Sequence, residues 1–112
     1  MVDVTSIETM EWKLTRPDTA DGVYAKTLLS NNCIKMALTR VKPGGSFKSH
    51  QDNYGHLFYF LSGEGTLHVS DKQHKIVPGL VVHINTGESH AYTNTGKQDL
   101  TLISTNIITQ AI

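Results

Sequence analysis

The sequence of 112 residues is poor in cysteine and proline, and its charges cancel. The single cysteine, Cys33, excludes an internal disulfide. Because it has no activating neighbour and opens an apolar run, we expect an inert thiol in the core. Ten basic and ten acidic residues give a net charge of zero, which argues against non-specific binding to nucleic acid or to an anionic membrane surface.

The chain also lacks targeting signals and several common catalytic signatures. Residues 1–12 have no basic region before a long apolar stretch, so they do not resemble a signal peptide, and no apolar run is long enough to cross a bilayer. We therefore expect a cytoplasmic protein with neither membrane nor nucleic-acid partners. A glycine-rich phosphate loop, a nucleophile elbow and a CxxC pair are absent as well, so the function is not expected to rest on those chemistries.

Short β-branched and aromatic runs separated by glycine, proline and asparagine make up most of the chain. This pattern predicts an all-β sandwich or barrel, and the length predicts one domain over residues 1–112. The predicted strands are Thr9–Leu14, Val23–Leu29, Cys33–Val41, Ser46–His50, His56–Ser62, Gly65–Ser70, Gln73–Val77, Val81–Ile84, His90–Thr93 and Leu100–Ile107.

One of these strands, His56–Ser62, has apolar side chains on both faces. His56, Phe58 and Phe60 alternate with Leu57, Tyr59 and Leu61. We expect Phe58 and Phe60 in the core, and the opposite face against a second sheet or a partner subunit.

Two sets of spaced residues carry the most specific signal. The first set is Gly44, His50, Asp52, His56 and Gly63, and the second is Gly79, Asn85, Gly87, His90 and Asn94. His50 and Asp52 are two residues apart, so in an extended chain their side chains leave the same face. Three imidazoles and one carboxylate form a mononuclear metal site if they converge.

This spacing resembles the two motifs of the cupin family, G(X)5HXH(X)3-4E(X)6G and G(X)5PXG(X)2H(X)3N. The first motif would cover residues 44–63 and the second residues 79–94. Asp52 stands in place of the family's second histidine, His56 in place of its glutamate, and Asn85 in place of its proline. Some small cupins also have histidine at the glutamate position. The chain is thus identified as a small single-domain cupin, which implies an RmlC-like double-stranded β-helix, or jelly-roll, barrel.

The resemblance also implies a function. His50, Asp52, His56 and His90 would hold one divalent transition metal, which could be Fe, Mn, Zn, Ni or Cu. Small cupins include dioxygenases, isomerases, lyases and cyclases, and mixed histidine and carboxylate ligation favours an oxidoreductase of dioxygenase type acting on a small organic substrate. The alternatives are a non-catalytic small-molecule-binding or dimerisation module and a metal-dependent isomerase or lyase.

The role of Asp52 stays open at this point. Residues 51–55 also form a good turn sequence, so Asp52 is a metal ligand, a turn residue that hydrogen-bonds its own backbone, or a residue behind the ligands that orients a histidine or acts as a base. Tyr54, in the same segment, lies either over the pocket mouth or on the surface.

Tyr92 and Arg40 are the speculative catalytic candidates. Tyr92 shares a strand face with His90, so it either donates a proton to a substrate or forms part of the barrel wall. Arg40 either binds a substrate carboxylate, if its face lines the barrel, or is an ordinary surface cation. We expect the three other histidines, His68, His74 and His83, to lie outside the site.

A homodimer is the assembly that the family resemblance implies. The N-terminal strands between residues 9 and 29, which include Trp12, are candidates for packing or exchange between two copies.

Overall fold

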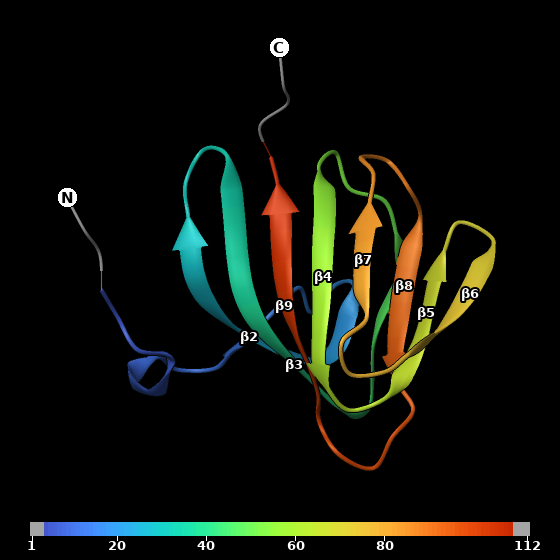
Figure 1. Cartoon of the computed structure of the whole chain (residues 1–112), viewed down its shortest axis with the longest axis horizontal. Helices are drawn as coiled ribbons and strands as arrows, with labels where there is room; N and C mark the ends of the chain where they lie inside the picture. The colour runs from blue at the N-terminus through green and yellow to red at the C-terminus, as the bar shows by residue number, and fades with distance from the viewer. Residues whose placement is uncertain (1–3, 109–112) are drawn as a thin grey trace.

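The computed structural model of the chain describes residues 4–108, and these form a curled sheet of nine antiparallel strands (Figure 1). After the short 3-10 turn η1 (Ile7–Thr9), the strands are β1 (Lys13–Leu14), β2 (Ala20–Ser30), β3 (Ile34–His50), β4 (Gly55–Ser62), β5 (Gly65–Val69), β6 (Lys72–Ile76), β7 (Val81–Ile84), β8 (His90–Asn94) and β9 (Leu100–Ile107). Their order across the sheet is β6-β5-β8-β3-β9-β4-β7; in addition β2 pairs with β3, and β1 pairs with β2. The predicted all-β class is confirmed: the sheet is a curled half-barrel.

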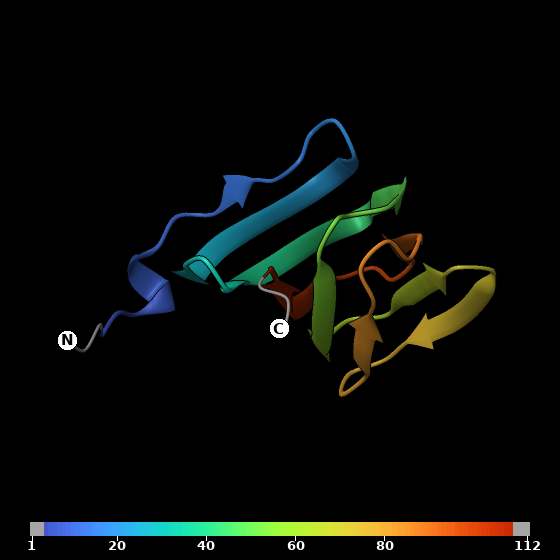
Figure 2. The ribbon, with the colours of Figure 1, turned by 90° about the horizontal axis from the view of Figure 1, so that it is seen from above.

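The long strand β3 joins the two halves of this sheet. Its first part, residues 34–41, pairs with β9, and its last part, residues 46–50, pairs with β8. The two halves curl toward each other on either side of β3 (Figure 2). The sequence pattern predicted two strands separated by residues 43–45, but the structure has one strand that continues through them.

Glycine explains why β3 continues through this segment instead of stopping. Gly44 has a φ of +79°, a conformation that glycine adopts without steric cost. A Cβ at Gly45 would lie 2.8 Å from the carbonyl oxygen of Asp21, so a side chain would not fit where β2 and β3 approach each other. The sequence signal therefore marked a bend within a strand and not its end.

The core lies on the inner face of the curled sheet. Phe58 and Phe60 belong to it, as predicted, and they are 3% and 0% exposed. Leu57 and Tyr59 alternate with them on the outer face and are 39% and 47% exposed. Within residues 4–108 no second sheet covers this outer face. A partner subunit on this face, the other alternative from the sequence, stays a prediction.

The N-terminal segment differs from its prediction. Only Lys13 and Leu14 of the predicted strand Thr9–Leu14 pair with β2, because the chain before them forms η1. Trp12 packs against the cationic groups of Lys26 and Arg40, which lie 4.8 Å and 4.3 Å from its ring centroid. The segment thus lies against β2 and β3 of its own chain.

The prediction that Cys33 belongs to the core is wrong. Cys33 is exposed, and it lies in the turn between β2 and β3, where its backbone N–H donates to the Asn31 side chain at 2.8 Å. An asparagine turn, and not the start of an apolar strand, sets its position. Among residues 4–108 there is no helix of the length and hydrophobicity needed to span a bilayer.

Candidate metal centre

Four predicted ligand residues meet where the two halves of the sheet come together. His50 ends β3 and His90 begins β8, and these two residues are direct cross-strand partners with ring centroids 4.3 Å apart. His56 comes from β4, and its ring lies 4.7 Å from that of His90. Asp52 comes from the loop between β3 and β4, which is tied to the β7–β8 connection by a bond from the Gly87 N–H to the Asp52 carbonyl, at 2.9 Å.

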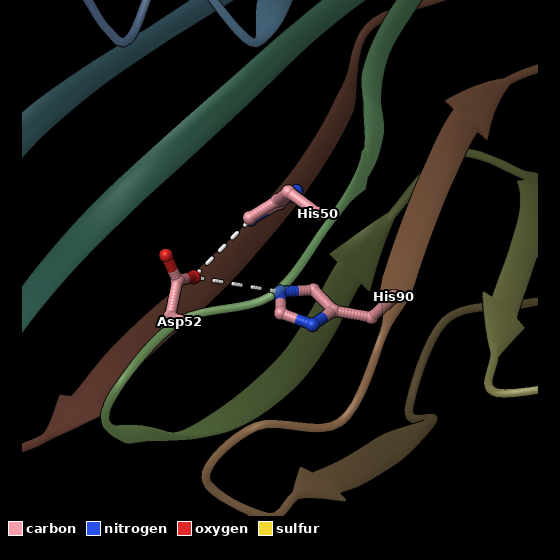
Figure 3. A group of neighbouring side chains, drawn as sticks. All are labelled: His50, Asp52 and His90. Atoms are coloured by element: carbon pink, nitrogen blue, oxygen red, sulfur yellow. Dashed lines mark ion pairs between the residues drawn. The ribbon is translucent and has the colours of Figure 1, made fainter.

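The side chains converge on one carboxylate oxygen. Asp52 Oδ2 lies 2.8 Å from His56 Nε2, 3.2 Å from His50 Nε2 and 3.8 Å from His90 Nε2. His50, Asp52 and His90, drawn in Figure 3, have ligand atoms that all lie within 4.8 Å of one another. Donors bound at ~2.1 Å to one ion, at right angles, lie ~3 Å apart. The trio of His50, Asp52 and His90 could therefore hold a metal ion, and His56 lies next to it.

The second ring nitrogen of each histidine is also engaged. Nδ1 of His50 donates to the carbonyl of Lys48 at 2.7 Å, and Nδ1 of His90 donates to the carbonyl of Glu88 at 2.9 Å. Nδ1 of His56 donates to the side-chain oxygen Oδ1 of Asn106 at 3.2 Å. A neutral imidazole carries one proton, so these bonds leave a lone pair on each Nε2, which is the atom that faces Asp52. Bonds of this kind orient the histidine ligands of metal sites.

The donor set fits a cation. Three Nε2 lone pairs and a carboxylate oxygen would repel one another unless a proton or a metal ion lay among them. Burial lowers the pKa of His56, although the negative charge of Asp52 beside it acts in the opposite direction, and burial likewise lowers the pKa of His90. These two imidazoles are therefore neutral at pH 7, which is the state that binds a metal.

Asp52 is ionised under the same conditions. Burial raises the pKa of this carboxyl, but the close contact with His56 and the charge of Arg16 outweigh burial, and the pKa lies below its usual value. The guanidinium nitrogen Nη1 of Arg16 lies 3.2 Å from Asp52 Oδ1 and 3.5 Å from Oδ2, and Oδ2 is the oxygen that faces the histidines. Asp52 is thus part of the cluster. Its place in the turn between β3 and β4 brings its carboxylate next to the histidines.

A cavity of about 310 Å³ opens beside the cluster. Its wall near the histidines is aromatic and includes Phe47, Tyr54, Phe58 and Tyr92. Tyr54 thus lines the cavity, which is the first of the two positions that the sequence allowed. Burial raises the pKa of Tyr54, and the charge of Asp52 raises it further.

The two speculative catalytic residues lie in different places. Tyr92 lines the cavity with its ring against Phe47 and Phe58, and burial raises the pKa of its hydroxyl, which stays protonated. Arg40 is not brought to the cavity. Its guanidinium lies over Trp12 on the outer side of the sheet, with Nε 3.9 Å from Asp99 Oδ2.

Two residues of the site were missed in the sequence. Arg16 belongs to a segment that looked like a simple turn; it has a φ of +44° and lines the cavity. Asn106 is paired directly with His56 across β9 and β4. Alternation along β9 could have placed Asn106 on the inner face, whereas no local signal pointed to Arg16.

His68, His74 and His83 are exposed and lie outside the cluster, as predicted.

Comparison with known proteins agrees with this architecture. The family model described as "cupin domain" matches residues 37–106, which is more than half of the chain. The chain therefore belongs to the cupin domain family, and it is a small member of it.

Two relatives come from Thermotoga maritima. An oxalate-binding protein is 32% identical over 87 residues, which cover 77% of this chain and 72% of the relative. The crystal structure of a predicted oxalate decarboxylase is 28% identical, covers 96% of this chain and 100% of its own, and superposes with a TM-score of 0.86.

A third structure supports the fold alone. The polyketide cyclase RemF from Streptomyces resistomycificus superposes with a TM-score of 0.87 over 100% of this chain and 83% of its own, at 19% identity. This chain is thus related to oxalate-binding and decarboxylase-type cupins and shares its fold with a cyclase.

Proposed function

We propose that this cupin is a mononuclear metal-dependent enzyme that acts on a small organic substrate in the adjacent cavity. One divalent transition metal ion would be held by His50, Asp52, His56 and His90. The observation that carries this proposal is the convergence of three imidazole Nε2 atoms on one carboxylate oxygen, with each Nδ1 already engaged elsewhere. Fe, Mn, Zn, Ni and Cu all accept such a set of donors.

Oxidoreductase chemistry of the dioxygenase type is the reaction that we favour. A six-coordinate ion with four protein ligands keeps two open positions, and such an ion, when bound, can activate oxygen or polarise a substrate. Aromatic rings line the cavity beside these positions, and the protonated Tyr92 hydroxyl is a candidate donor to the substrate. A metal-dependent lyase is the second candidate, because one relative is a predicted oxalate decarboxylase.

A binding module without catalysis is the competing class. The oxalate-binding relative supports a small-molecule ligand for this chain as well. The two classes differ in coordination: an enzyme of the proposed type needs positions open to oxygen or substrate, whereas a non-catalytic module has either a closed site or no metal.

Nitric oxide, a stable surrogate for oxygen, tests the open positions. Protein loaded anaerobically with Fe(II) should bind nitric oxide and give a half-integer-spin signal in electron paramagnetic resonance. His90→Ala should lose both the iron and this signal, whereas His83→Ala, which changes an exposed histidine, should keep both. Wild-type protein that binds iron but not nitric oxide would favour the binding module, and wild-type protein that takes up no metal would refute the proposal.

We further propose a homodimer, with a second copy on the outer face of β4 and β7. This face presents Leu57, Tyr59, Leu61 and Val81, the last of which is 60% exposed, and the zero net charge of the chain removes overall repulsion between copies. Sedimentation should give a dimer at micromolar concentration, and Val81→Glu should give a monomer while His74→Glu, on the β5–β6 hairpin, does not. A monomeric wild-type protein would contradict this assembly.

A further inference from the structure

Three of the cavity-lining side chains are cationic, and none of the others that line it is a carboxylate. Lys13, Arg16 and Lys35 contribute to the lining, while the nearby Asp52 directs its oxygens to the histidines and to Arg16. Because the chain as a whole has zero net charge, this is a local concentration of positive charge. A cavity of this kind attracts anions.

Arg16 is the cation nearest the candidate metal centre. Its Nη1 lies 3.2 Å and 3.5 Å from the two oxygens of Asp52, and its guanidinium lies 5.9 Å from the ring centroid of Phe47. Among residues 4–108 the guanidinium has no further hydrogen-bond partner, so most of its five N–H donors are available to a ligand. The planar arrangement of these donors matches a carboxylate.

Lys35 lies farther from the centre, on the same inner face. The strand pairing places Lys35 opposite Asn106 in β9, and Asn106 opposite His56 in β4. Two strand spacings therefore separate Lys35 from His56, or about 10 Å between their Cα atoms. Lys13 faces the cavity from β1, where it pairs with Ala25.

Small side chains keep the space between these groups open. Ala37 and Ser104 are cross-strand partners that line the cavity, two residues along from Lys35 and Asn106 and on the same face. The volume of about 310 Å³ equals that of about ten water molecules, which exceeds what a six-atom ligand such as oxalate would fill. The cavity therefore accommodates a longer molecule that reaches from the metal centre toward Lys35.

We propose that the substrate is an organic dianion longer than oxalate. Arg16 binds the carboxylate beside the metal ion, and Lys35, assisted by Lys13, binds a second anionic group at the far end of the cavity. This inference rests on the proposed metal site, and it adds the class of substrate and the residues that select it.

Calorimetric titration with two dicarboxylates of different length tests the proposal. Oxalate and adipate are titrated into Mn(II)-loaded protein at moderate salt, with the neutral diamide of adipate as the uncharged probe, and the metal content of each sample is measured first. Arg16→Gln should weaken both dicarboxylates roughly tenfold, because charge-assisted hydrogen bonds are lost. Lys35→Gln and the Lys13→Gln/Lys35→Gln double variant should weaken adipate by roughly threefold or more and leave oxalate unchanged.

The matched control is Lys72→Gln, which removes one positive charge from the exposed strand β6 and should change neither affinity. Adipate that binds the double variant as tightly as wild type, or the diamide binding as tightly as adipate, would overturn the inference. If Arg16→Gln loses its metal, its affinities are not compared, and the adipate affinity of the Lys13→Gln/Lys35→Gln variant tests the inference. Wild-type protein without bound metal would refute the proposed function instead, and a charge-dependent adipate affinity in that protein would still support the anion site.

Discussion

Arg16 and Arg40 are each close to an aspartate and to aromatic rings, yet they lie on opposite sides of the sheet. Arg16 lies 3.2 Å from Asp52 and 5.9 Å from the Phe47 ring centroid, inside the cavity. Arg40 lies 3.9 Å from Asp99 and stacks over Trp12 and Tyr24 on the outer side. The same side chain therefore lines the cavity in one place and packs against the N-terminal segment in the other.

The difference teaches that the face of the sheet that a side chain reaches decides its contacts. Arg40 shares the outer face with Leu38, because Thr39 between them is buried and lines the cavity. Arg16 lies in the segment between β1 and β2, has a positive φ and reaches the cavity, where it contacts Asp52. Four predictions can break or sharpen this contrast between the inner and outer faces.

The largest effect is expected at the histidines of the inner face. His90→Ala should lower metal affinity by more than ~100-fold, because a direct ligand is lost and loss of even its supporting partners typically costs 10–100-fold. His83→Ala removes an exposed histidine from the outer face and should bind metal as wild type does. Calorimetric titration with Mn(II) or Zn(II) measures both, and equal losses in the two variants would contradict the contrast.

Asn106 should show the next largest effect. Asn106→Ala removes the acceptor of His56 Nδ1–H, so the ring loses its fixed orientation and metal affinity should fall about tenfold or more. Asn106→Asp keeps an acceptor at this position and should keep most of the affinity. If the alanine and aspartate variants behave alike in metal titrations, the hydrogen bond does not orient His56.

Arg40 should affect stability and not the metal. Arg40→Ala should lower the free energy of unfolding by about 1 kcal/mol, since its cation–π contacts with Trp12 and Tyr24 are lost. Urea denaturation of the metal-free protein measures the stability loss, and metal titration supplies the second readout. Lower metal affinity in this variant would show that the contacts of Arg40 with Trp12 and Tyr24 influence the metal site, which would contradict the prediction.

The smallest effect is a dependence of the metal-free protein on pH. The folded-state pKa values of His56 and His90 lie below the usual 6.5, so between pH 7 and pH 5 the unfolded chain gains protons that the folded chain does not. The free energy of unfolding should therefore fall as the pH falls through this range. Asp52 does not oppose this trend between pH 7 and pH 5. Its lowered pKa adds to the free energy of unfolding, and this addition is lost only at more acidic pH.

The control for this pH dependence is the double variant His56→Gln/His90→Gln. It should show a shallower decline of stability between pH 7 and pH 5 in the presence of a chelator. An equally steep decline would assign the effect to other groups.

The spacing of the two motifs predicted the fold class and the residues that converge, because backbone punctuation and strand alternation are local properties of the chain. It could not decide the role of Asp52, which depends on how the loop between β3 and β4 is tied to Gly87. Arg16 and Lys35 reach the cavity from segments distant in sequence, through strand pairing and a single positive φ. The bend at Gly44 and Gly45 looked like a strand end, because the same residues serve both purposes.

Anomalous diffraction from crystals grown with Mn(II) would test the central claim most directly. The account predicts one manganese ion bonded to Nε2 of His50, His56 and His90 and to Oδ2 of Asp52, with Arg16 still on the other carboxylate oxygen. Crystals that contain no manganese at this position, with Asp52 still packed against the histidines, would contradict it.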